Sequence, residues 1–214
     1  MPKPPSNPTQ VIALTGGIGS GKSRILQWLA SQGLPTLNAD QIARDIVAPG
    51  TEALNAIVQK FGQNMLQKDG TLNRAKLRQQ IFQSPEAKTW LEQLLHPKIR
   101  QQTQKQIETF KKQQPALIII EIPLLAETGK PDYIDQVWVA DCQETTLCQR
   151  AAQRENTSPA DIQKIIDQQA SRSQRLALAD YIINTEGSFE EVIEQLNQIL
   201  LQLNFKKPHP VKNS

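Results

Sequence analysis

Five short apolar runs alternate along the chain with longer segments whose apolar residues recur at helical spacing. The runs occupy residues 11–14, 34–37, 116–122, 136–140 and 181–183. Short strands separated by helix-length segments are typical of a parallel sheet that is covered by helices on both faces. We therefore predict an α/β fold of three layers around a five-stranded parallel sheet, formed by a single domain over residues 9–205.

The clearest helical pattern lies near the end of the chain. Ser188 and Glu191 have the spacing of a capping box. The apolar residues that follow form one stripe at Val192, Ile193, Leu196, Ile199, Leu200 and Leu203. This pattern predicts a helix that packs on the core and carries no chemistry.

Two segments interrupt the alternation of strands and helices. The stretch between residues 37 and 116 is much longer than one crossover helix requires, so we predict a helical insertion over about 54–113. Within it, we expect a turn at Asp69-Gly70, a capped helix start at Ser84-Pro85 and a break at His96-Pro97.

The second interruption covers about residues 144–173. We predict two helices there, at Glu144–Arg154 and Pro159–Ser173, with Ser158 as the N-cap of the second and Pro159 at its first position.

The most informative motif follows the first apolar run. Residues 16–23 read Gly-Gly-Ile-Gly-Ser-Gly-Lys-Ser and match the phosphate-binding loop pattern G-x-x-x-x-G-K-[ST]. In such a loop the backbone N–H groups surround phosphate oxygens, the lysine reaches the β- and γ-phosphates, and the final hydroxyl is a ligand of Mg²⁺. We therefore expect ATP and Mg²⁺ as cofactors, with Lys22 catalytic and Ser23 at the metal. The nucleotide is expected to contact Gly17, Ile18, Gly19, Ser20, Gly21, Lys22 and Ser23.

The two interruptions change what the loop implies. A small-molecule kinase needs one element that holds the acceptor and a mobile lid that excludes water during phosphoryl transfer. The segment 54–113 suits the first role and the segment 144–173 suits the second. The sequence thus favours a kinase of the phosphate-binding-loop (P-loop) class.

Composition limits the possible partners and compartment. The chain is 38% hydrophobic and 21% charged, its net charge is +3, and only 5% of its residues are aromatic, so neither a membrane nor a nucleic-acid surface is indicated. Its two cysteines, Cys142 and Cys148, have no disulfide or metal-site spacing, and we expect them to be reduced in the cytoplasm. We further expect a monomer, no secretory signal, a disordered leader over 1–8 and a disordered tail over 206–214.

Several motifs together resemble those of the dephospho-CoA kinase family over about residues 11–203. They are, in order, Ile-Ala-Leu-Thr-Gly-Gly-Ile-Gly-Ser-Gly-Lys-Ser at 12–23, Asn-Ala-Asp-Gln-Ile-Ala-Arg at 38–44, Leu-Leu-His-Pro-Lys-Ile-Arg at 94–100, Glu-Ile-Pro-Leu-Leu-Ala-Glu at 121–127 and Gln-Arg at 149–150. The resemblance implies transfer of the ATP γ-phosphoryl group to the ribose 3′-hydroxyl of dephospho-CoA, the last step of coenzyme A biosynthesis. It also implies a helical CoA-binding insertion and a lid.

Three residues depart from the family pattern. Arg24 stands where Thr or Ser is usual, although Ser23 is intact. Asn38 replaces the first aspartate of an Asp-x-Asp segment, and Glu121 stands where Asp is common. The last two departures bear on metal handling.

The resemblance assigns roles to three groups whose types also allow a plain structural role. Asp40 is implied as the base for the acceptor hydroxyl, and helix capping is the alternative. Arg44 lies one helical turn later on the same helix face and is a candidate to bind a substrate phosphate, with an ion pair to Asp40 as the alternative. Arg150, and less clearly Arg154, are candidates to stabilise the transferring phosphoryl group, or else belong to a solvated helix face.

The remaining expected site residues rest on the family motifs. His96 is implied to contact the acceptor substrate, or else marks a helix boundary. Thr15, Leu124 and Leu125 are expected at the substrate, and Asn184, after the last strand, is expected near the adenine or in a plain turn.

Two rival functions remain open at this stage. The first is another small-molecule kinase, acting on a nucleoside, nucleotide or sugar, for which the segments at 94–97 and 123–125 would not be expected. The second is a nucleotide-dependent switch, but a guanine-specific one would need an Asn-Lys-x-Asp segment, which the sequence lacks.

Overall fold

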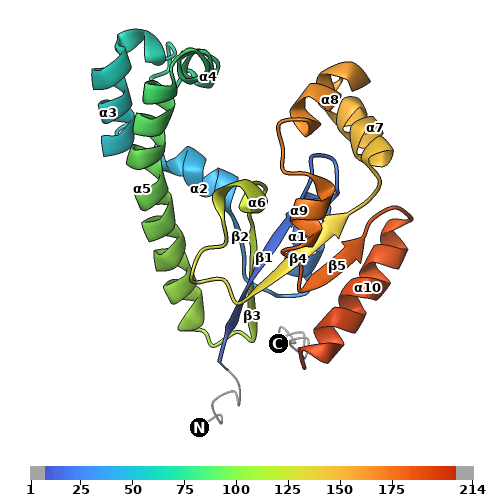
Figure 1. Ribbon diagram of the computed structural model, residues 1–214. Coiled ribbons are helices and arrows are strands. Elements are labelled where there is room, and N and C mark those ends of the chain that lie inside the picture. The colour runs from blue at the N-terminus through green and yellow to red at the C-terminus, as the bar shows by residue number, and fades with distance from the viewer. Residues whose placement is uncertain (1–7, 206–214) are drawn as a thin grey trace. The chain divides into compact units, whose positions relative to one another are not determined.

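The fold is known from a computed structural model that describes residues 8–205 (Figure 1). The expected leader, apart from residue 8, and the expected tail lie outside this range. Among the described residues no helix is long and apolar enough to cross a membrane.

Five parallel strands form one sheet in the order β2-β3-β1-β4-β5, which confirms the predicted fold class. The strands are β1 Gln10–Gly16, β2 Thr36–Asn38, β3 Leu117–Glu121, β4 Gln136–Asp141 and β5 Tyr181–Asn184. The second strand begins two residues later than the apolar run at 34–37 suggests. The reason is Pro35, which has no N–H to donate to the ladder and contributes only its carbonyl, to Ile119 N.

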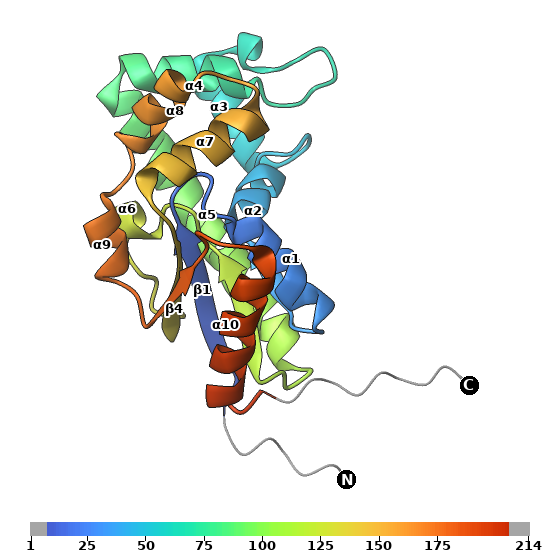
Figure 2. The same ribbon diagram turned by 90° about the vertical axis from the view of Figure 1, so that its right-hand side faces the viewer.

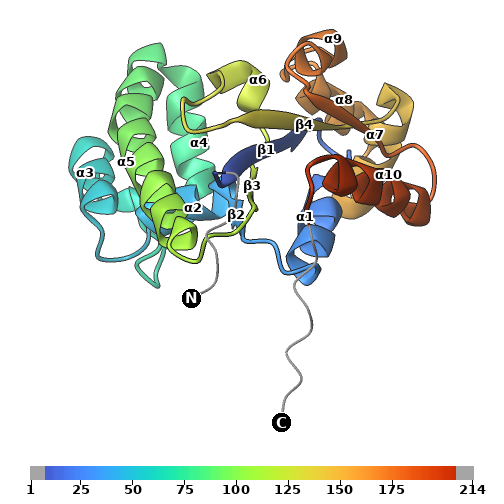
Figure 3. The same ribbon diagram turned by 90° about the horizontal axis from the view of Figure 1, so that it is seen from below.

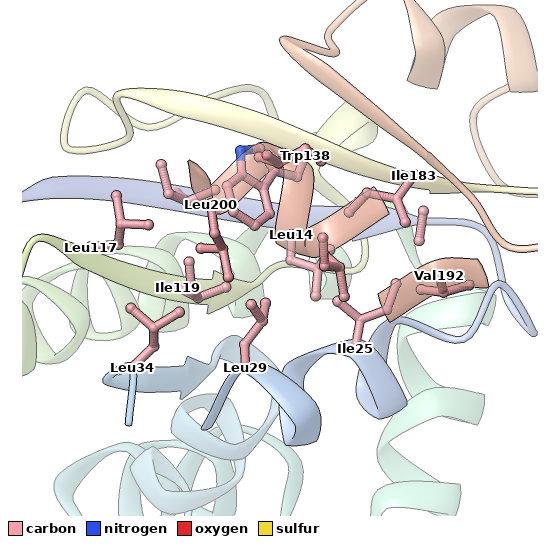
Figure 4. Packing of buried hydrophobic residues seen from close by; sticks show 14 residues of the cluster. Leu14, Ile25, Leu29, Leu34, Leu117, Ile119, Trp138, Ile183, Val192 and Leu200 are labelled. Carbon is pink, nitrogen blue, oxygen red and sulfur yellow. The ribbon is translucent and has the colours of Figure 1, made fainter. Parts of the chain in front are cut away.

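One face of the sheet packs on α1 (Lys22–Ser31) and α10 (Phe189–Gln202). Figures 2 and 3 show these helices side by side, and Figure 4 shows the core that they make with the strands. Trp138 is completely buried in it, and its ring meets Tyr181 edge-on at 6.1 Å. Ser188 caps α10 by accepting a hydrogen bond from Glu191 N, which is one half of the predicted capping box; the return bond from Ser188 N to the Glu191 side chain is not among the contacts of these two described residues.

The opposite face of the sheet is also buried, as a parallel sheet requires. Ile118 and Ile120 of β3 are fully inaccessible, and Val137 and Val139 of β4 are each 1% exposed. Figure 3 shows α6 (Leu125–Thr128) and α9 (Arg172–Leu176) on the side of the sheet away from α1 and α10.

The chain divides into two compact units, one made of residues up to Asn38 and from Thr109 onward, the other of Ala39–Glu108. The second unit is helical, as the long interval between strands suggests. Its elements are α2 Ala39–Ile46, α3 Glu52–Phe61, the 3₁₀ helix η1 Gln63–Met65, α4 Arg74–Gln83 and most of α5 Pro85–Lys111. It has a hydrophobic core of its own, in which Ile57 is fully buried and Phe61 meets Trp90 edge-on at 5.3 Å.

The helix break predicted at His96-Pro97 is wrong. Ser84 does cap α5, through a hydrogen bond from Ala87 N, but the helix then runs through Pro97 to Lys111. An internal proline costs a helix roughly 3 kcal/mol, because one backbone hydrogen bond is lost and its ring clashes with the preceding turn. Buried residues on either side, among them Leu91 and Ile107, offset that cost.

The segment after β4 also differs from the prediction in one respect. Helix α7 (Glu144–Glu155) is followed by α8 (Pro159–Ile166), with Ser158 as N-cap and Pro159 at the start, as expected. The expected single helix at 159–173 is instead two, because α8 ends at Ile166 and α9 begins at Arg172. Ser171 and Gln174 form a capping box that starts α9 independently.

Candidate functional site

The phosphate-binding loop joins β1 to α1 at the carboxyl end of the central strand. Its glycines are required by close packing. A Cβ on Gly16 would lie 2.4 Å from the carbonyl oxygen of Ala140. A Cβ on Gly19, whose φ is 77°, would lie 2.5 Å from the carbonyl oxygen of Leu147. The loop can therefore take this shape only with glycine at both positions.

Lys22 points back into the loop that precedes it. Its Nζ donates hydrogen bonds of 2.8 Å to the carbonyl oxygens of both Gly16 and Gly17, and the side chain is buried. This places the ammonium on the inner side of the loop, where a lysine of this motif meets the β- and γ-phosphates.

Three polar side chains meet beside the loop. The Ser23 hydroxyl donates to Glu121 Oε1 at 3.0 Å, and the Asn38 amide donates to Glu121 Oε2 at 2.8 Å. Asn38 and Glu121 are register partners on neighbouring strands, and Glu121 is buried. Two of the departures from the family pattern therefore touch each other.

The same oxygens suit Mg²⁺. A hydroxyl and a carboxylate are hard donors, and Mg²⁺ usually takes only one or two protein ligands and completes its shell with phosphate and water. Among residues 8–205 there is no group of three or more acidic, histidine or cysteine side chains that would form a protein-only metal cage. Ser23, supported by Glu121, is thus the group that fits the metal.

A pocket of about 220 Å³ opens at the start of α1. It is lined by Gly21, Arg24, Ile25, Arg150, Thr185, Gly187, Phe189 and Val192. The Arg24 guanidinium lies 3.8 Å from the centre of the Phe189 ring, which is a cation–π contact. Flat cationic and aromatic walls of this kind suit a nucleobase.

The two arginines of α7 have different surroundings. Arg150 lines the pocket and donates to the carbonyl oxygens of Thr185 at 2.7 Å and Glu186 at 3.2 Å. Arg154 is exposed and pairs with the neighbouring Glu155 at 2.8 Å. The geometry therefore favours Arg150 as a site residue and a solvated position for Arg154.

The other residues expected to contact a ligand outside the helical unit differ in how accessible they are. Thr15 is fully buried and hydrogen-bonds the Pro123 carbonyl. Leu125 is fully buried too, whereas Leu124 is 47% exposed, so Leu124 is the leucine that a ligand can reach. Asn184 accepts from Glu186 N in the turn after β5, and it is Thr185 and Gly187 that line the pocket.

The helical unit contains a separate pocket of about 480 Å³. Its walls include Arg44, Arg74, Pro49 and Asn73. The Asp40–Arg44 ion pair, the alternative considered for Arg44, is absent from the contacts of the described residues. Arg44 is therefore not committed to a structural pair.

Asp40 and His96 lie in the same helical unit and are both exposed. Helix α2 begins at Ala39, so Asp40 is in its first turn and not in the preceding capping position. His96 lies within α5, where it marks no helix boundary.

Sequence reasoning missed a group of polar residues just before β5. Arg172 forms a two-pronged ion pair with Asp141, with a shortest distance of 2.6 Å, and this partner raises the pKa of the guanidinium. Arg175 is buried next to the phosphate-binding loop, and Gln169 accepts a hydrogen bond from Ile18 N at 3.1 Å. A signal was present, since Arg172 and Arg175 are the only charged residues between 168 and 179 and stand one helical turn apart.

The two cysteines are free and buried. Burial raises the pKa of the Cys142 thiol, so it stays protonated at neutral pH. Neither cysteine is therefore placed as a nucleophile.

Comparison with known proteins gives evidence independent of this geometry. A sequence model of the dephospho-CoA kinase family matches residues 10–191. The chain is 50% identical over 191 residues to a dephospho-CoA kinase of Hydrogenovibrio crunogenus, covering 89% of this chain and 96% of the relative. It is 42% identical over 198 residues to that of Pasteurella multocida, covering 92% and 94%.

Solved structures give the same result for the fold. A protein from Thermus thermophilus, TT1252, superposes with a TM-score of 0.78 at 24% identity, covering 92% of this chain and 99% of that one. The dephospho-CoA kinase from Campylobacter jejuni superposes with a TM-score of 0.69 at 28% identity, covering 90% and 96%. With matches of this extent in both sequence and fold, the chain belongs to the dephospho-CoA kinase family.

Proposed function

We propose that this protein transfers the γ-phosphoryl group of ATP to the ribose 3′-hydroxyl of dephospho-CoA. The observation that carries the proposal is the family match over residues 10–191, together with an intact phosphate-binding loop. In this reaction the 3′-oxygen forms a bond to the γ-phosphorus, the bond from that phosphorus to the β,γ-bridging oxygen breaks, and ADP leaves.

The nucleotide half of the reaction belongs to the loop and the pocket beside it. The loop N–H groups and Lys22 hold the phosphates, and the 220 Å³ pocket with Arg24, Arg150 and Phe189 takes the base. Ser23, hydrogen-bonded to Glu121, would hold Mg²⁺. When bound, this ion would neutralise negative charge on the β- and γ-phosphates.

The acceptor half belongs to the helical unit. Dephospho-CoA carries a diphosphate, and arginine side chains bind phosphate oxygens well because each guanidinium can donate two parallel hydrogen bonds. The pocket with Arg44 and Arg74 is therefore proposed for this substrate, with His96 of the same unit as a further contact. Asp40, exposed and unpaired among the described residues, takes the proton from the 3′-hydroxyl.

The compartment and the assembly are also proposals. Two free, buried cysteines fit a reducing cytoplasm, and we propose a monomer that acts on small molecules alone. Light scattering of the purified chain measures the assembly directly.

The test is ADP release from ATP and Mg²⁺ in the presence of dephospho-CoA, compared with a panel of nucleosides, nucleotides and sugars. We expect release to depend on dephospho-CoA, and mass spectrometry to show that this acceptor has gained one phosphate. Equal or greater stimulation by another acceptor would establish the rival kinase function instead.

A further inference from the structure

Arg175 is a buried cation without a buried anion. Its side chain is 6% exposed, and the hydrogen bond recorded for it goes to a neutral group, the carbonyl oxygen of Ala170. Within residues 8–205 no carboxylate pairs with it, whereas Arg172 is paired with Asp141 and Arg154 with Glu155.

Such an arrangement is costly unless something else supplies the opposite charge. Removing a charged group from water costs several kcal/mol, and buried arginines are almost always paired. Because residues 8–205 offer no charged partner, a bound anion is the group that would supply the compensating charge.

The position of Arg175 identifies that anion. A Cβ on Gly17 would lie 3.3 Å from one terminal nitrogen of the guanidinium and 3.4 Å from its central carbon. The carbonyl of the same Gly17 accepts from Lys22 Nζ at 2.8 Å. Two cations thus flank one loop residue.

The lysine of this motif reaches the β- and γ-phosphates, so Gly17 marks the end of the site that holds them. The base pocket with Arg150 and Phe189 begins at Gly21, at the other end of the loop. Arg175 therefore stands at the triphosphate end of the loop.

The segment that carries Arg175 is fixed to its surroundings. Gln169 accepts a hydrogen bond from Ile18 N of the loop at 3.1 Å, and Glu127 accepts one from Ala170 N at 2.7 Å. The capping box of Ser171 and Gln174 then starts α9 immediately before Arg175. The guanidinium is thus held in place before any ligand binds, as electrostatic stabilisation of a transition state requires.

We propose that Arg175 contacts the γ-phosphoryl group of ATP and stabilises the charge on it during transfer. The proposal rests on the kinase function above and adds a catalytic residue to it. Arg175 forms no covalent bond and moves no proton; it donates hydrogen bonds to the oxygens of the phosphoryl group while that group passes from ADP to the acceptor.

The test compares Arg175→Gln and Arg175→Lys with Lys164→Gln, which removes an exposed cation on α8 that pairs only with Asp161. Glutamine keeps a hydrogen-bond donor for the Ala170 carbonyl. Lysine keeps the positive charge but lacks the planar guanidinium that can donate two parallel hydrogen bonds. Titration calorimetry measures Mg·ATP and Mg·ADP affinity without acceptor, and steady-state kinetics with dephospho-CoA give kcat and KM.

For Arg175→Gln we expect a kcat loss of about 10²–10³-fold, as when one preorganised donor is removed from a transition state. ATP affinity should fall at least tenfold while ADP affinity stays within about twofold. Arg175→Lys should fall between Gln and wild type, and Lys164→Gln should match wild type.

A purely structural role predicts another pattern. Equal losses of ATP and ADP affinity, or a kcat within about threefold of wild type, would overturn the proposal. If Arg175→Gln does not fold, Arg175→Lys decides by the same two measurements. If wild type binds ATP but does not phosphorylate dephospho-CoA, the proposed function fails while the ATP-to-ADP affinity ratio still tests Arg175.

Discussion

Asn38→Asp is a small change with a large expected cost. The Asn38 amide donates to Glu121 Oε2 at 2.8 Å, and Glu121 is only 3% exposed. The substitution keeps the shape of the side chain but replaces the donor with a second carboxylate. It also restores the residue that is usual in the family, so the prediction runs against the expectation from family pattern alone.

The distance sets the magnitude. Two unit charges 2.8 Å apart repel by about 6 kcal/mol at an effective dielectric of about 20, and by about 4 kcal/mol if the side chains move to roughly 4.5 Å. Loss of this hydrogen bond, as in Asn38→Ala, costs about 1.5–3 kcal/mol because the acceptor is charged. We expect Asn38→Asp to be at least about 2 kcal/mol worse than Asn38→Ala.

Urea unfolding in EDTA, followed by circular dichroism, measures both costs without metal. Asn38→Asp combined with Glu121→Gln exchanges donor and acceptor, so the double variant should recover most of the loss and give a large coupling energy. If Asn38→Asp is no less stable than Asn38→Ala, or if the two changes are additive, the contact between positions 38 and 121 does not contribute to stability in this way.

Three further outcomes are expected. Lys22→Ala should cost several kcal/mol of transition-state stabilisation, seen as a loss in kcat/KM, and wild-type-like turnover would exclude its assigned role. Asp40→Asn should lower kcat by about 10²-fold, with ATP affinity and melting temperature unchanged. Turnover within about twofold of wild type would mean that Asp40 is no base and only stabilises α2 as an acidic residue in its first turn. Protease cleavage near Asn156, the left-handed residue that ends α7, should slow when ATP and dephospho-CoA are bound together, and unchanged cleavage with binding confirmed would argue against closure.

The sheet and the loop were predictable because their signals are local. Each strand is a short apolar run, and the phosphate-binding loop is eight consecutive residues between a strand and a helix. Errors arose where distant packing overrides a local signal. Pro97 reads as a break, yet buried residues on both sides keep α5 continuous.

The unpredicted parts of the site depend on contacts across the chain. Asn38 and Glu121 each stand out in the sequence as departures from the family, but only the register of β2 with β3 puts them in contact. Arg175 meets Gly17 because α9 packs beside the loop, and no spacing rule joins positions so far apart. Burial of its charge is likewise a property of the fold and not of the residue type.

Two close approaches fasten the α7–α8 hairpin to the phosphate-binding loop. At the start of α7, the Leu147 carbonyl lies where a side chain on Gly19 would be, and beyond α8 the Gln169 side chain holds Ile18 N. The Cβ and backbone N of Ala151, the eighth residue of α7, also lie 3.3 Å from that position, so the loop contacts more than one turn of the helix. A displacement of the loop on phosphate binding would therefore be passed to the hairpin, which connects the proposed nucleotide site to the segment predicted to be the lid.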